Sequence, residues 1–270
     1  MPTLDAAACA DLMDEITKIT AQAAETILDF AKTPDVKRKA DGSPVTSADL
    51  AAEAIICKGL QRLAPDVPVI SEEQAARAKP MAIRGGSYFL VDPLDGTREF
   101  IAGRDEYTVN IALVTDGAPH FGIICAPALG DLWRGIVGRG AERISLARRT
   151  EAPTPIRTRR RPQSEAVVVI SRSHLEARTK SYVDGLPGAK LVQSGSSIKF
   201  CRLAEGFADV YPRLAPTHDW DIAAGHAILK AAGGSVTAPD GAPLVYGSND
   251  LLIPAFLAWG DPLSAVLLKG

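Results

Sequence analysis

The stretch Val91–Phe100 reads VDPLDGTREF, and the rest of the chain is organised around it. An apolar run, Tyr88–Val91, leads into the stretch and predicts a buried strand. Proline has no N–H group to donate to a sheet, so we expect the strand to end at Asp92-Pro93. The residues that follow would then stand at the carboxyl end of a buried strand.

This acidic turn combines two kinds of binding group. Asp92 and Asp95 supply carboxylate oxygens, which hard cations prefer as ligands. Gly96 completes a turn, and Thr97 can begin a helix whose first N–H groups are free to bind a phosphate group. A cation site and an anion site on one short stretch indicate metal-assisted phosphate chemistry.

The composition is that of a globular protein without a strong charge bias. Hydrophobic residues make up 46% and charged residues 23% of the 270 residues, so the chain can form one large unit or two closely packed ones. The formal net charge of −2 gives no reason to expect a nucleic-acid partner. No apolar run approaches the roughly 20 residues of a membrane span, so we expect no integral membrane segment.

Two further features concern location. The N-terminal segment Met1–Asp14 lacks the basic and apolar regions of a secretory signal. The four cysteines lie far apart and form no CxxC pair, which favours reduced thiols over a zinc site or disulfides. We therefore expect a cytoplasmic protein, and a peripheral position at the inner face of the membrane stays open.

The first half of the chain is predicted to begin with two helices. Apolar side chains spaced three and four apart predict a helix over Leu4–Ala31, and a second helix begins near Thr46 and runs to about Leu63. Between them, the basic segment Asp35–Asp41 is interpreted as a solvated loop. A flap over an anionic substrate is the alternative.

Other acidic positions have both a plain and a functional interpretation. Asp49 falls in the first turn of the second helix, where spacing alone favours complementing the helix dipole over a role at an active site. Glu72 and Glu73 follow the short strand Val67–Ile70 and, taken alone, are typical of a solvated surface. Their position is informative, because two neighbouring strands that end in carboxylates would bring those groups to one point.

The two halves of the chain differ in how their elements alternate. In the first half, apolar segments at Tyr107–Val114, His120–Ala126 and Leu132–Val137 predict an antiparallel meander. In the second half, strands and helices alternate, which predicts α/β layers. The expected fold class is therefore α+β followed by α/β.

A domain boundary is expected in the proline-rich and arginine-rich segment 151–163. We predict an N-terminal domain at 1–155 and a C-terminal domain at 156–270. The arginine run Arg157–Arg161 offers positive charge for phosphate or nucleic acid, but no aromatic residues are interleaved with it. A solvated linker is the favoured interpretation.

Four acids share a position at the end of a strand or the start of a helix: Glu72, Asp92, Asp95 and Asp221. Together with the Leu94 carbonyl they could hold two or three Mg²⁺ ions. Phosphate monoesters hydrolyse extremely slowly unaided. Paired metal ions overcome this by holding a water molecule in line and neutralising the leaving oxygen.

Two further groups complete this chemistry. Thr97 is placed to contact the attacking water, with Asp49 as the hydrogen-bond partner of its hydroxyl. The N–H groups of Gly96 and Thr97 would hold the phosphate oxygens.

A haloacid-dehalogenase-type phosphatase is a rival interpretation of the same residues. Its motif, Asp-x-Asp-Gly-Thr, uses the first aspartate as a covalent nucleophile. Here two residues separate Asp92 from Asp95, and side chains three apart share a face only where the chain turns, as Pro93 would make it. The motif also lies near residue 90 rather than near the N-terminus, so we disfavour this rival.

Taken together, the acidic motifs resemble those of a known family. In chain order they are Asp49, Glu72-Glu73, Asp92-Pro93-Leu94-Asp95-Gly96-Thr97 and Trp220-Asp221-Ile222-Ala223-Ala224-Gly225. They are similar to those of the inositol monophosphatase-like superfamily of Mg²⁺-dependent, lithium-sensitive phosphatases. A narrower resemblance, to its CysQ-type 3'(2'),5'-bisphosphate nucleotidases, is carried by SEE at 71–73, SRSH at 171–174, GSSIKFC at 195–201 and YPR at 211–213 with Pro216-Thr217.

The resemblance implies a layered αβαβα sandwich and assigns roles to individual residues. The implied metal ligands are Glu72, Asp92, the Leu94 carbonyl, Asp95 and Asp221. The implied catalytic residues are Asp49, Thr97 and Glu72. The implied substrate-binding residues are Gly96, Thr97, His174, Ser196, Lys199, Arg213 and Asp221. Lys199 and Arg213 suit a substrate with two phosphate groups, which needs cations beyond the metal cluster.

The resemblance also implies an activity and leaves alternatives open. The substrate would be 3'-phosphoadenosine 5'-phosphate, converted to AMP and phosphate with Mg²⁺ as the cofactor, so that a by-product of sulfate assimilation is recycled. An inositol monophosphatase or a related sugar-phosphate phosphatase would use the same metal site. A non-catalytic metal or phosphate sensor is a third possibility. A homodimer stays open.

Overall fold

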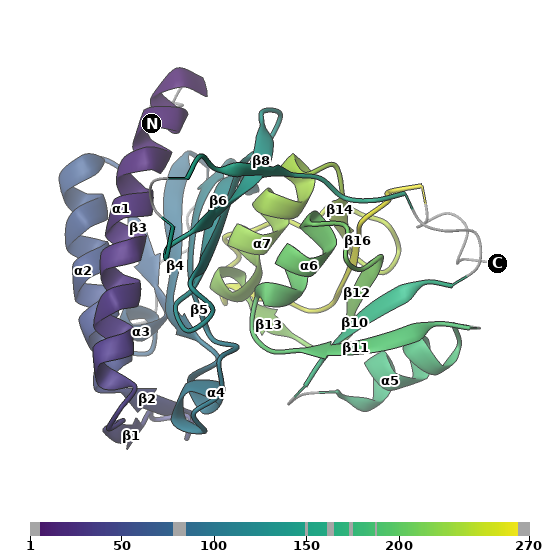
Figure 1. Cartoon of the computed structure of the whole chain (residues 1–270), viewed down its shortest axis with the longest axis horizontal. Helices are drawn as coiled ribbons and strands as arrows, with labels where there is room; N and C mark the ends of the chain where they lie inside the picture. Colours follow the sequence, from purple (N-terminus) through teal and green to yellow (C-terminus); the bar gives the residue numbers. More distant parts are fainter. Residues whose placement is uncertain are drawn as a thin grey trace.

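The computed structural model describes residues 6–77, 85–148, 151–160, 165–172, 175–186 and 188–263. Helices and sheets alternate across it in the order helix, sheet, helix, sheet, helix (Figure 1). The predicted layered αβαβα sandwich is therefore confirmed. Within the described residues, no helix is both long enough and apolar enough to cross a membrane.

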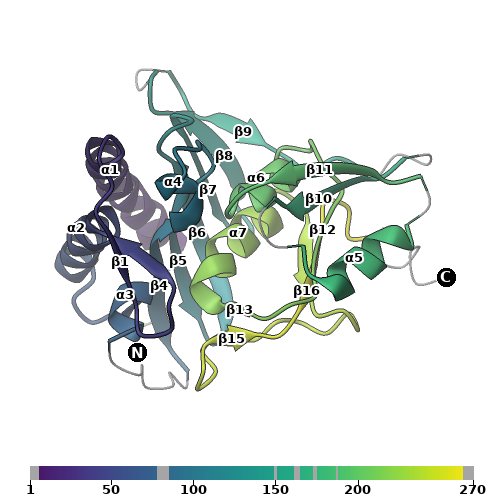
Figure 2. The ribbon, with the colours of Figure 1, turned by 90° about the horizontal axis from the view of Figure 1, so that it is seen from below.

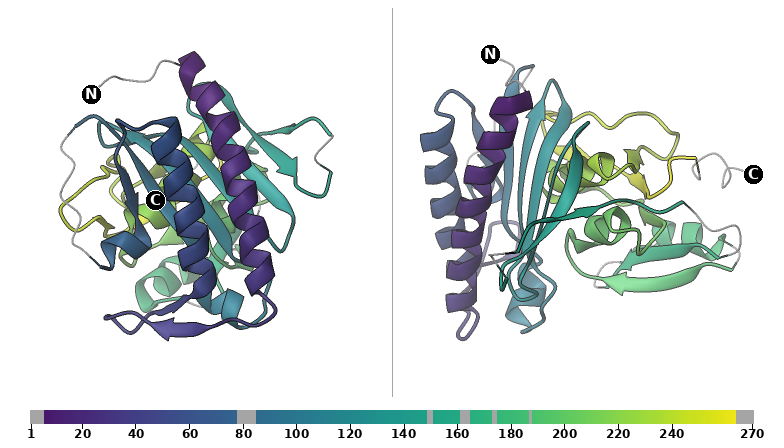
Figure 3. Two further views of the ribbon diagram at one scale, coloured as in Figure 1. Left: turned by 90° about the vertical axis from the view of Figure 1, so that its left-hand side faces the viewer. Right: turned by 45° about the horizontal axis from the view of Figure 1, so that its top comes forward.

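The larger sheet, as far as the structure describes it, has seven strands in the order β3-β4-β5-β6-β7-β8-β9. Its strands are β3 (Val69–Ser71), β4 (Ser87–Asp95), β5 (Thr108–Thr115), β6 (Ala118–Ala126), β7 (Asp131–Ile136), β8 (Gly140–Ser145) and β9 (Thr154–Ile156). β3 pairs with β4 in parallel, and the other neighbours are antiparallel. The helices of this half are α1 (Ala6–Phe30), α2 (Ser47–Leu63), α3 (Glu72–Ala75) and α4 (Thr97–Ile101). Figure 3 shows α1 and α2 side by side across the outer face of the sheet.

Strand β4 separates two hydrophobic cores. Successive side chains of a strand point to opposite faces. Phe89 and Val91 accordingly join the core beneath α1 and α2, whereas Tyr88 and Leu90 face the second half of the chain. All four are almost fully buried, which is why this stretch reads as a continuous apolar run rather than an alternating one.

The smaller sheet has the order β11-β10-β12-β16-β14 among the described residues. The remaining elements of the second half are β10 (Val167–Ser171), α5 (Ala177–Asp184), β11 (Lys190–Ser194), α6 (Ile198–Ala204), β12 (Val210–Arg213), β13 (Thr217–His218), α7 (Asp219–Ala231), β14 (Ser235–Thr237), β15 (Leu252–Ile253) and β16 (Phe256–Trp259). Helices α6 and α7 fill the layer between the two sheets (Figure 1). Val183 of α5 packs against the opposite face of the smaller sheet.

The predicted strand end at Asp92-Pro93 was wrong, because β4 continues through Pro93 to Asp95. β12 likewise contains a proline, Pro212, and runs to Arg213. Pro93 is tolerated because it falls where the pairing of β4 with β5 is irregular, so its missing N–H group interrupts no regular ladder.

The sequence also hid two strands of the larger sheet. β8 lies in a region rich in glycine and arginine, and β9 lies in the proline-rich segment 151–163, and neither shows a clear apolar alternation. Ile156 of β9 pairs with Ala141 of β8, so a boundary at 155/156 would fall within β9. We keep the division into two domains as a proposal, with its boundary just after this strand.

The basic segment before α2 is not simply a solvated loop. β1 (Val36–Arg38) and β2 (Pro44–Thr46) form an antiparallel hairpin at the same end of the molecule as α3 and α4 (Figure 2). The β1 side chains are exposed as expected, but the Lys39 side chain is only 9% exposed. The solvated-loop interpretation was therefore wrong at Lys39.

Candidate active site

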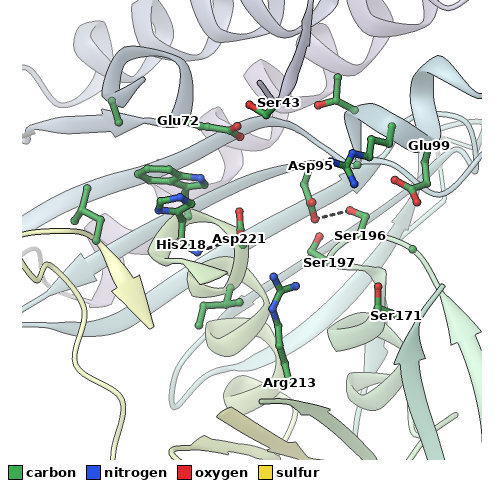
Figure 4. Close-up of a pocket in the computed structure, with 18 of the residues that line it drawn as sticks. Ser43, Glu72, Asp95, Glu99, Ser171, Ser196, Ser197, Arg213, His218 and Asp221 are labelled. Carbon is green, nitrogen blue, oxygen red and sulfur yellow. Dashed lines mark hydrogen bonds between the residues drawn. The ribbon is translucent and has the colours of Figure 1, made fainter. Parts of the chain in front are cut away.

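A cavity of about 590 Å³ lies where the two halves of the chain meet. The first half contributes the hairpin, the start of α3 and the turn Asp95–Thr97. The second half contributes the turn before α6, the end of β12 and the start of α7. Figure 4 shows Glu72, Asp95 and Asp221 on one side of this pocket and Arg213 reaching into it from another.

The acids of the first half converge because of strand pairing. β3 and β4 run in parallel, with Ser71 opposite Val91. The next residues along the two strands are Glu72 and Asp92, so both carboxylates emerge at the same edge of the sheet. The prediction that neighbouring strands deliver acids to one point is confirmed.

A β-bulge gives Asp92 and Asp95 their common direction. Asp92 lies opposite Asn110 and Asp95 opposite Thr108, so three steps along β4 face two steps along β5. The extra residue shifts the alternation of side chains, and positions three apart come to share one side of the strand. We had expected Pro93 to turn the chain at this point, and the structure produces the same result within a continuous strand.

Asp221 reaches the pocket from the first turn of α7. Its Oδ2 accepts a hydrogen bond from the Thr217 hydroxyl and one of 3.1 Å from the His218 N–H group. The His218 ring stacks on that of Trp220, with centroids 4.4 Å apart. These contacts fix the beginning of the helix and hold the carboxylate toward the pocket (Figure 4).

The electrostatics of the acids indicate a site for cations. Asp92 is 1% exposed, and burial raises its pKa well above the ordinary value. The negative charges of Glu72, Asp95 and Asp221 raise the same pKa further. Carboxylates held this close in a buried position need positive charge between them to stay ionised. The donor set, all oxygen, fits Mg²⁺.

The carboxylates nevertheless have other partners in this conformation. Among the described residues, no three His, Cys, Asp or Glu side chains already stand together as a ready-made metal site. Asp95 Oδ2 accepts a 2.6 Å hydrogen bond from Ser196 Oγ, and Glu72 Oε1 is 2.6 Å from Lys39 Nζ. The metal ligands therefore stay a proposal.

Asp49 makes contacts that fit both interpretations of its position. Its Oδ2 accepts hydrogen bonds from the N–H group and the hydroxyl of Thr46, which forms a capping box at the start of α2. Its Oδ1 accepts a 3.2 Å hydrogen bond from Thr97 Oγ1, so the expected contact between these side chains is present. Thr97 Oγ1 is also 3.1 Å from the Leu94 carbonyl oxygen. Burial raises the pKa of Asp49.

Three of the four predicted nucleotide-binding residues of the second half line the pocket, and the fourth, His174, lies outside the described residues. Ser196 has a φ of 50° and bonds Asp95. The Lys199 ammonium donates to the Ser196 carbonyl and lies 5.2 Å from the centroid of the Tyr211 ring. The Nε of Arg213 is buried without a hydrogen-bond partner. Lys199 is the second residue of α6, which begins at Ile198.

Several residues that shape the site had no role predicted from the sequence. Lys39 also contacts Glu73, at 2.7 Å, and its place in a basic run was the only signal for it. Thr108 Oγ1 lies 2.7 Å from Ser197 Oγ, which in turn donates to Asn110 Oδ1 at 2.6 Å. This buried hydroxyl network joins β5 to the turn before α6. No local pattern in the sequence could have revealed it, because the partners are almost 90 residues apart.

Comparisons with known proteins place the chain within one family. The family model for the inositol monophosphatase family matches residues 7–265. The 3'(2'),5'-bisphosphate nucleotidase CysQ of Escherichia coli is 41% identical over 250 residues, which is 91% of this chain and 98% of that protein. The protein of the same name from Haemophilus influenzae is 30% identical, over 93% of each chain.

Solved structures agree. CysQ from Bacteroides thetaiotaomicron, a bacterial member of the inositol monophosphatase family, has a TM-score of 0.74 and 35% identity, covering 93% of this chain and 97% of that one. An inositol monophosphatase from Zymomonas mobilis has a TM-score of 0.76 and 25% identity, covering 98% and 99%. The chain belongs to the inositol monophosphatase family.

Proposed function

We propose that this protein is a Mg²⁺-dependent phosphatase that removes the 3'-phosphate of 3'-phosphoadenosine 5'-phosphate, giving AMP and phosphate. Enzymes of the inositol monophosphatase family are generally Mg²⁺-dependent, and the CysQ relatives are named 3'(2'),5'-bisphosphate nucleotidases. In a cell this activity would recycle a by-product of sulfate assimilation.

One observation carries the proposal: a single pocket has acids on one side and basic side chains on the other. Glu72, Asp95 and Asp221 line the first side, and Lys199 and Arg213 line the second. A substrate with two phosphate groups suits this division, because metal ions held by the acids would take one phosphate and the basic side chains the other.

The proposed metal ligands are those assigned by the family motif. They are Glu72, Asp92, the Leu94 carbonyl, Asp95 and Asp221, for two or three Mg²⁺ ions. When bound, Mg²⁺ supplies charge neutralisation at the phosphate and makes a water molecule a stronger nucleophile.

Thr97 and Asp49 would orient the attacking water. The Thr97 hydroxyl has one proton, and both neighbours in the structure, Asp49 and the Leu94 carbonyl, are acceptors for it. Its lone pairs are therefore free to accept a hydrogen bond from water on the pocket side. Water attacks phosphorus, the bond from phosphorus to the ribose 3'-oxygen breaks, and a proton from solvent or water completes the 3'-hydroxyl.

The remaining groups would bind the substrate. The N–H groups of Gly96 and Thr97, at the start of α4, would hold the oxygens of the reacting phosphate. Lys199 and Arg213 would bind the other phosphate, with Ser196 between the two subsites. We keep His174 as a proposed contact to the nucleotide.

An inositol monophosphatase or related sugar-phosphate phosphatase is the alternative, since the same acids would serve it. The direct experiment measures phosphate release from 3'-phosphoadenosine 5'-phosphate with Mg²⁺ and again after chelation. We expect turnover that disappears without Mg²⁺. Absence of any turnover on nucleotide or inositol phosphates would favour a non-catalytic sensor.

A further inference from the structure

Glu106 connects the two halves of the pocket, although it belongs to neither the proposed metal site nor the proposed nucleotide site. It lies between α4 and β5, and its side chain is 17% exposed. Its Oε2 accepts a 2.8 Å hydrogen bond from the Gly195 N–H group and lies 2.7 Å from an Arg172 guanidinium nitrogen. The Ser194 hydroxyl is 3.4 Å from its Oε1. One carboxylate thus receives three donors from the second half.

The backbone of Glu106 lies close to both turns that form the pocket, and closest to the turn at Gly195. A Cβ atom added to Gly195 would lie 2.8 Å from the Glu106 carbonyl oxygen and 2.9 Å from its Cβ. A Cβ atom added to Gly96 would lie 3.3 Å from the same carbonyl oxygen, and Gly96 has a φ of 89°. Only glycine permits the approach at 195, and only glycine adopts the conformation at 96 without strain. Glu106 is therefore wedged between the turn that carries Thr97 and the turn that carries Ser196.

The turn held by Glu106 places several groups of the substrate side. Ser196 follows Gly195 directly and bonds Asp95 across the pocket. The Ser196 carbonyl oxygen accepts a hydrogen bond from the Lys199 ammonium, so the position of the Lys199 side chain also depends on this turn. On the other side, the Thr108 hydroxyl contacts Ser196 and Ser197. Figure 4 shows Ser196 and Ser197 beside Asp95.

We propose that Glu106 is a positioning residue. Its carboxylate fixes the Ser194–Ser197 turn, so that the basic side of the pocket can bind a substrate that the acidic side holds. The inference rests on the proposed phosphatase activity. The charge is needed because a neutral amide has one oxygen for three donors, and its own N–H groups would face Arg172 or the Gly195 N–H group.

The kinetic test compares Glu106→Gln with the parent enzyme on 3'-phosphoadenosine 5'-phosphate. We expect KM to rise about tenfold or more, the size of a lost charge-assisted hydrogen bond, while kcat falls far less. The proposed metal ligands are untouched, so the Mg²⁺ concentration for half-maximal rate should stay unchanged. A loss of about tenfold in kcat with an unchanged KM would overturn the inference.

Asp209 offers a matched control. Its carboxylate likewise accepts a backbone N–H group, of Val167 at 2.7 Å, and an arginine, Arg159 at 2.8 Å, but it does not line the pocket. We expect Asp209→Asn to destabilise the protein without raising KM. If Asp209→Asn raises KM as much as Glu106→Gln, the effect reflects general destabilisation and the inference is wrong.

Hydrogen–deuterium exchange separates this inference from the proposed activity, because it needs no turnover. Glu106→Gln should speed exchange of the amides at 194–197, and Asp209→Asn should speed it at 166–168 instead. Unchanged exchange at 194–197 would contradict the positioning role even in an active enzyme. If the parent protein shows no phosphatase activity but Glu106→Gln speeds exchange at 194–197, the positioning role of Glu106 is supported and the proposed phosphatase activity is rejected.

Discussion

Ser196 Oγ donates a 2.6 Å hydrogen bond to Asp95 Oδ2, joining residues 101 positions apart in the chain. Asp95 stands at the end of the bulged strand β4, and Ser196 stands in the turn before α6. Burial and the charge of Asp221 raise the pKa of Asp95, and the hydrogen bond from Ser196 opposes this rise in part. The proposed metal site and the proposed nucleotide site therefore share a boundary.

Asp95→Asn should abolish phosphate release. The change removes one charged oxygen ligand from a cluster that must hold more than one cation, and we expect a loss of at least about a thousandfold in kcat. The fold should persist, because removing a charge that faces Asp221 relieves repulsion. Phosphate release and the thermal midpoint, measured together, check both statements. Near-native turnover would show that the metal assignment is wrong.

Lys199→Ala should discriminate between substrates. Lys199 is 4% exposed, lines the pocket, and is not one of the proposed metal ligands. We expect kcat/KM to fall by about tenfold or more on 3'-phosphoadenosine 5'-phosphate, and much less on inositol 1-phosphate, which has no second phosphate to lose. Parallel assays on both substrates test this. An equal loss on both would mean that Lys199 does not select the nucleotide.

Lys39→Gln should make the protein more dependent on Mg²⁺ for its stability. Lys39 contacts Glu72 and Glu73 at 2.6 and 2.7 Å. Burial lowers the pKa of Lys39, but these carboxylates outweigh burial and the net pKa is raised. Without this charge the metal-free protein keeps buried acids with no cation. Its thermal midpoint should fall by several degrees, at about 2–4 °C per kcal/mol for a chain of this size, and Mg²⁺ should restore more of it than in the parent.

Lys37→Gln is the control for that comparison. Lys37 lies on the same hairpin, is 69% exposed, and pairs only loosely with Asp35 at 3.7 Å. Its loss should change the thermal midpoint little with or without Mg²⁺. If both variants respond to Mg²⁺ in the same way, the ammonium of Lys39 has no special relation to the acids.

His226 should make the folded protein sensitive to acid. Burial, and to a lesser extent the charge of Lys230, lower its pKa to about 3, and its Nδ1 lies 2.9 Å from the Tyr246 hydroxyl. In the unfolded chain the imidazole takes up a proton near pH 6.5. The unfolded state therefore binds more protons between about pH 6.5 and 3, and stability is lost as pH falls through this window, with a slope approaching about 1.4 kcal/mol per pH unit.

Urea unfolding of the parent and of His226→Gln at several pH values checks this prediction. Carboxylates titrate in the same range in both proteins, so the difference between the two curves isolates the histidine. The parent should lose more stability between pH 6.5 and 4 than the variant. Parallel curves would show that His226 is not buried in its neutral form.

Much of the site was predictable because short local sequence patterns mark the positions of its acids. The acids Glu72, Asp92, Asp95 and Asp221 stand at the ends of strands or the start of a helix, and apolar runs and prolines mark those positions in the sequence. The α+β and α/β character of the two halves followed from the same patterns, and the layered αβαβα sandwich followed from the family resemblance. Asp49 could be placed in the first turn of its helix, but its contact with Thr97 depends on tertiary structure.

The features that were missed depend on partners far away in the chain. Lys39 and Glu106 look like ordinary surface charges in the sequence, and only the folded chain brings them to Glu72 and Gly195. The bulge in β4 exists because of the strand beside it, so proline alone gave the wrong strand end. β8 and β9 carry few apolar residues because they lie toward the edge of the sheet and are partly exposed.

The central claim is that acids of the first half, together with Asp221 of the second, support phosphate chemistry, and that basic side chains of the second half select a nucleotide with two phosphates. The most direct test is the ratio of kcat/KM for 3'-phosphoadenosine 5'-phosphate to that for inositol 1-phosphate, measured with Mg²⁺. Our account predicts a ratio of at least about a hundred, as two charge-assisted contacts would give. A ratio near or below one would contradict it and identify the protein as a sugar-phosphate phosphatase.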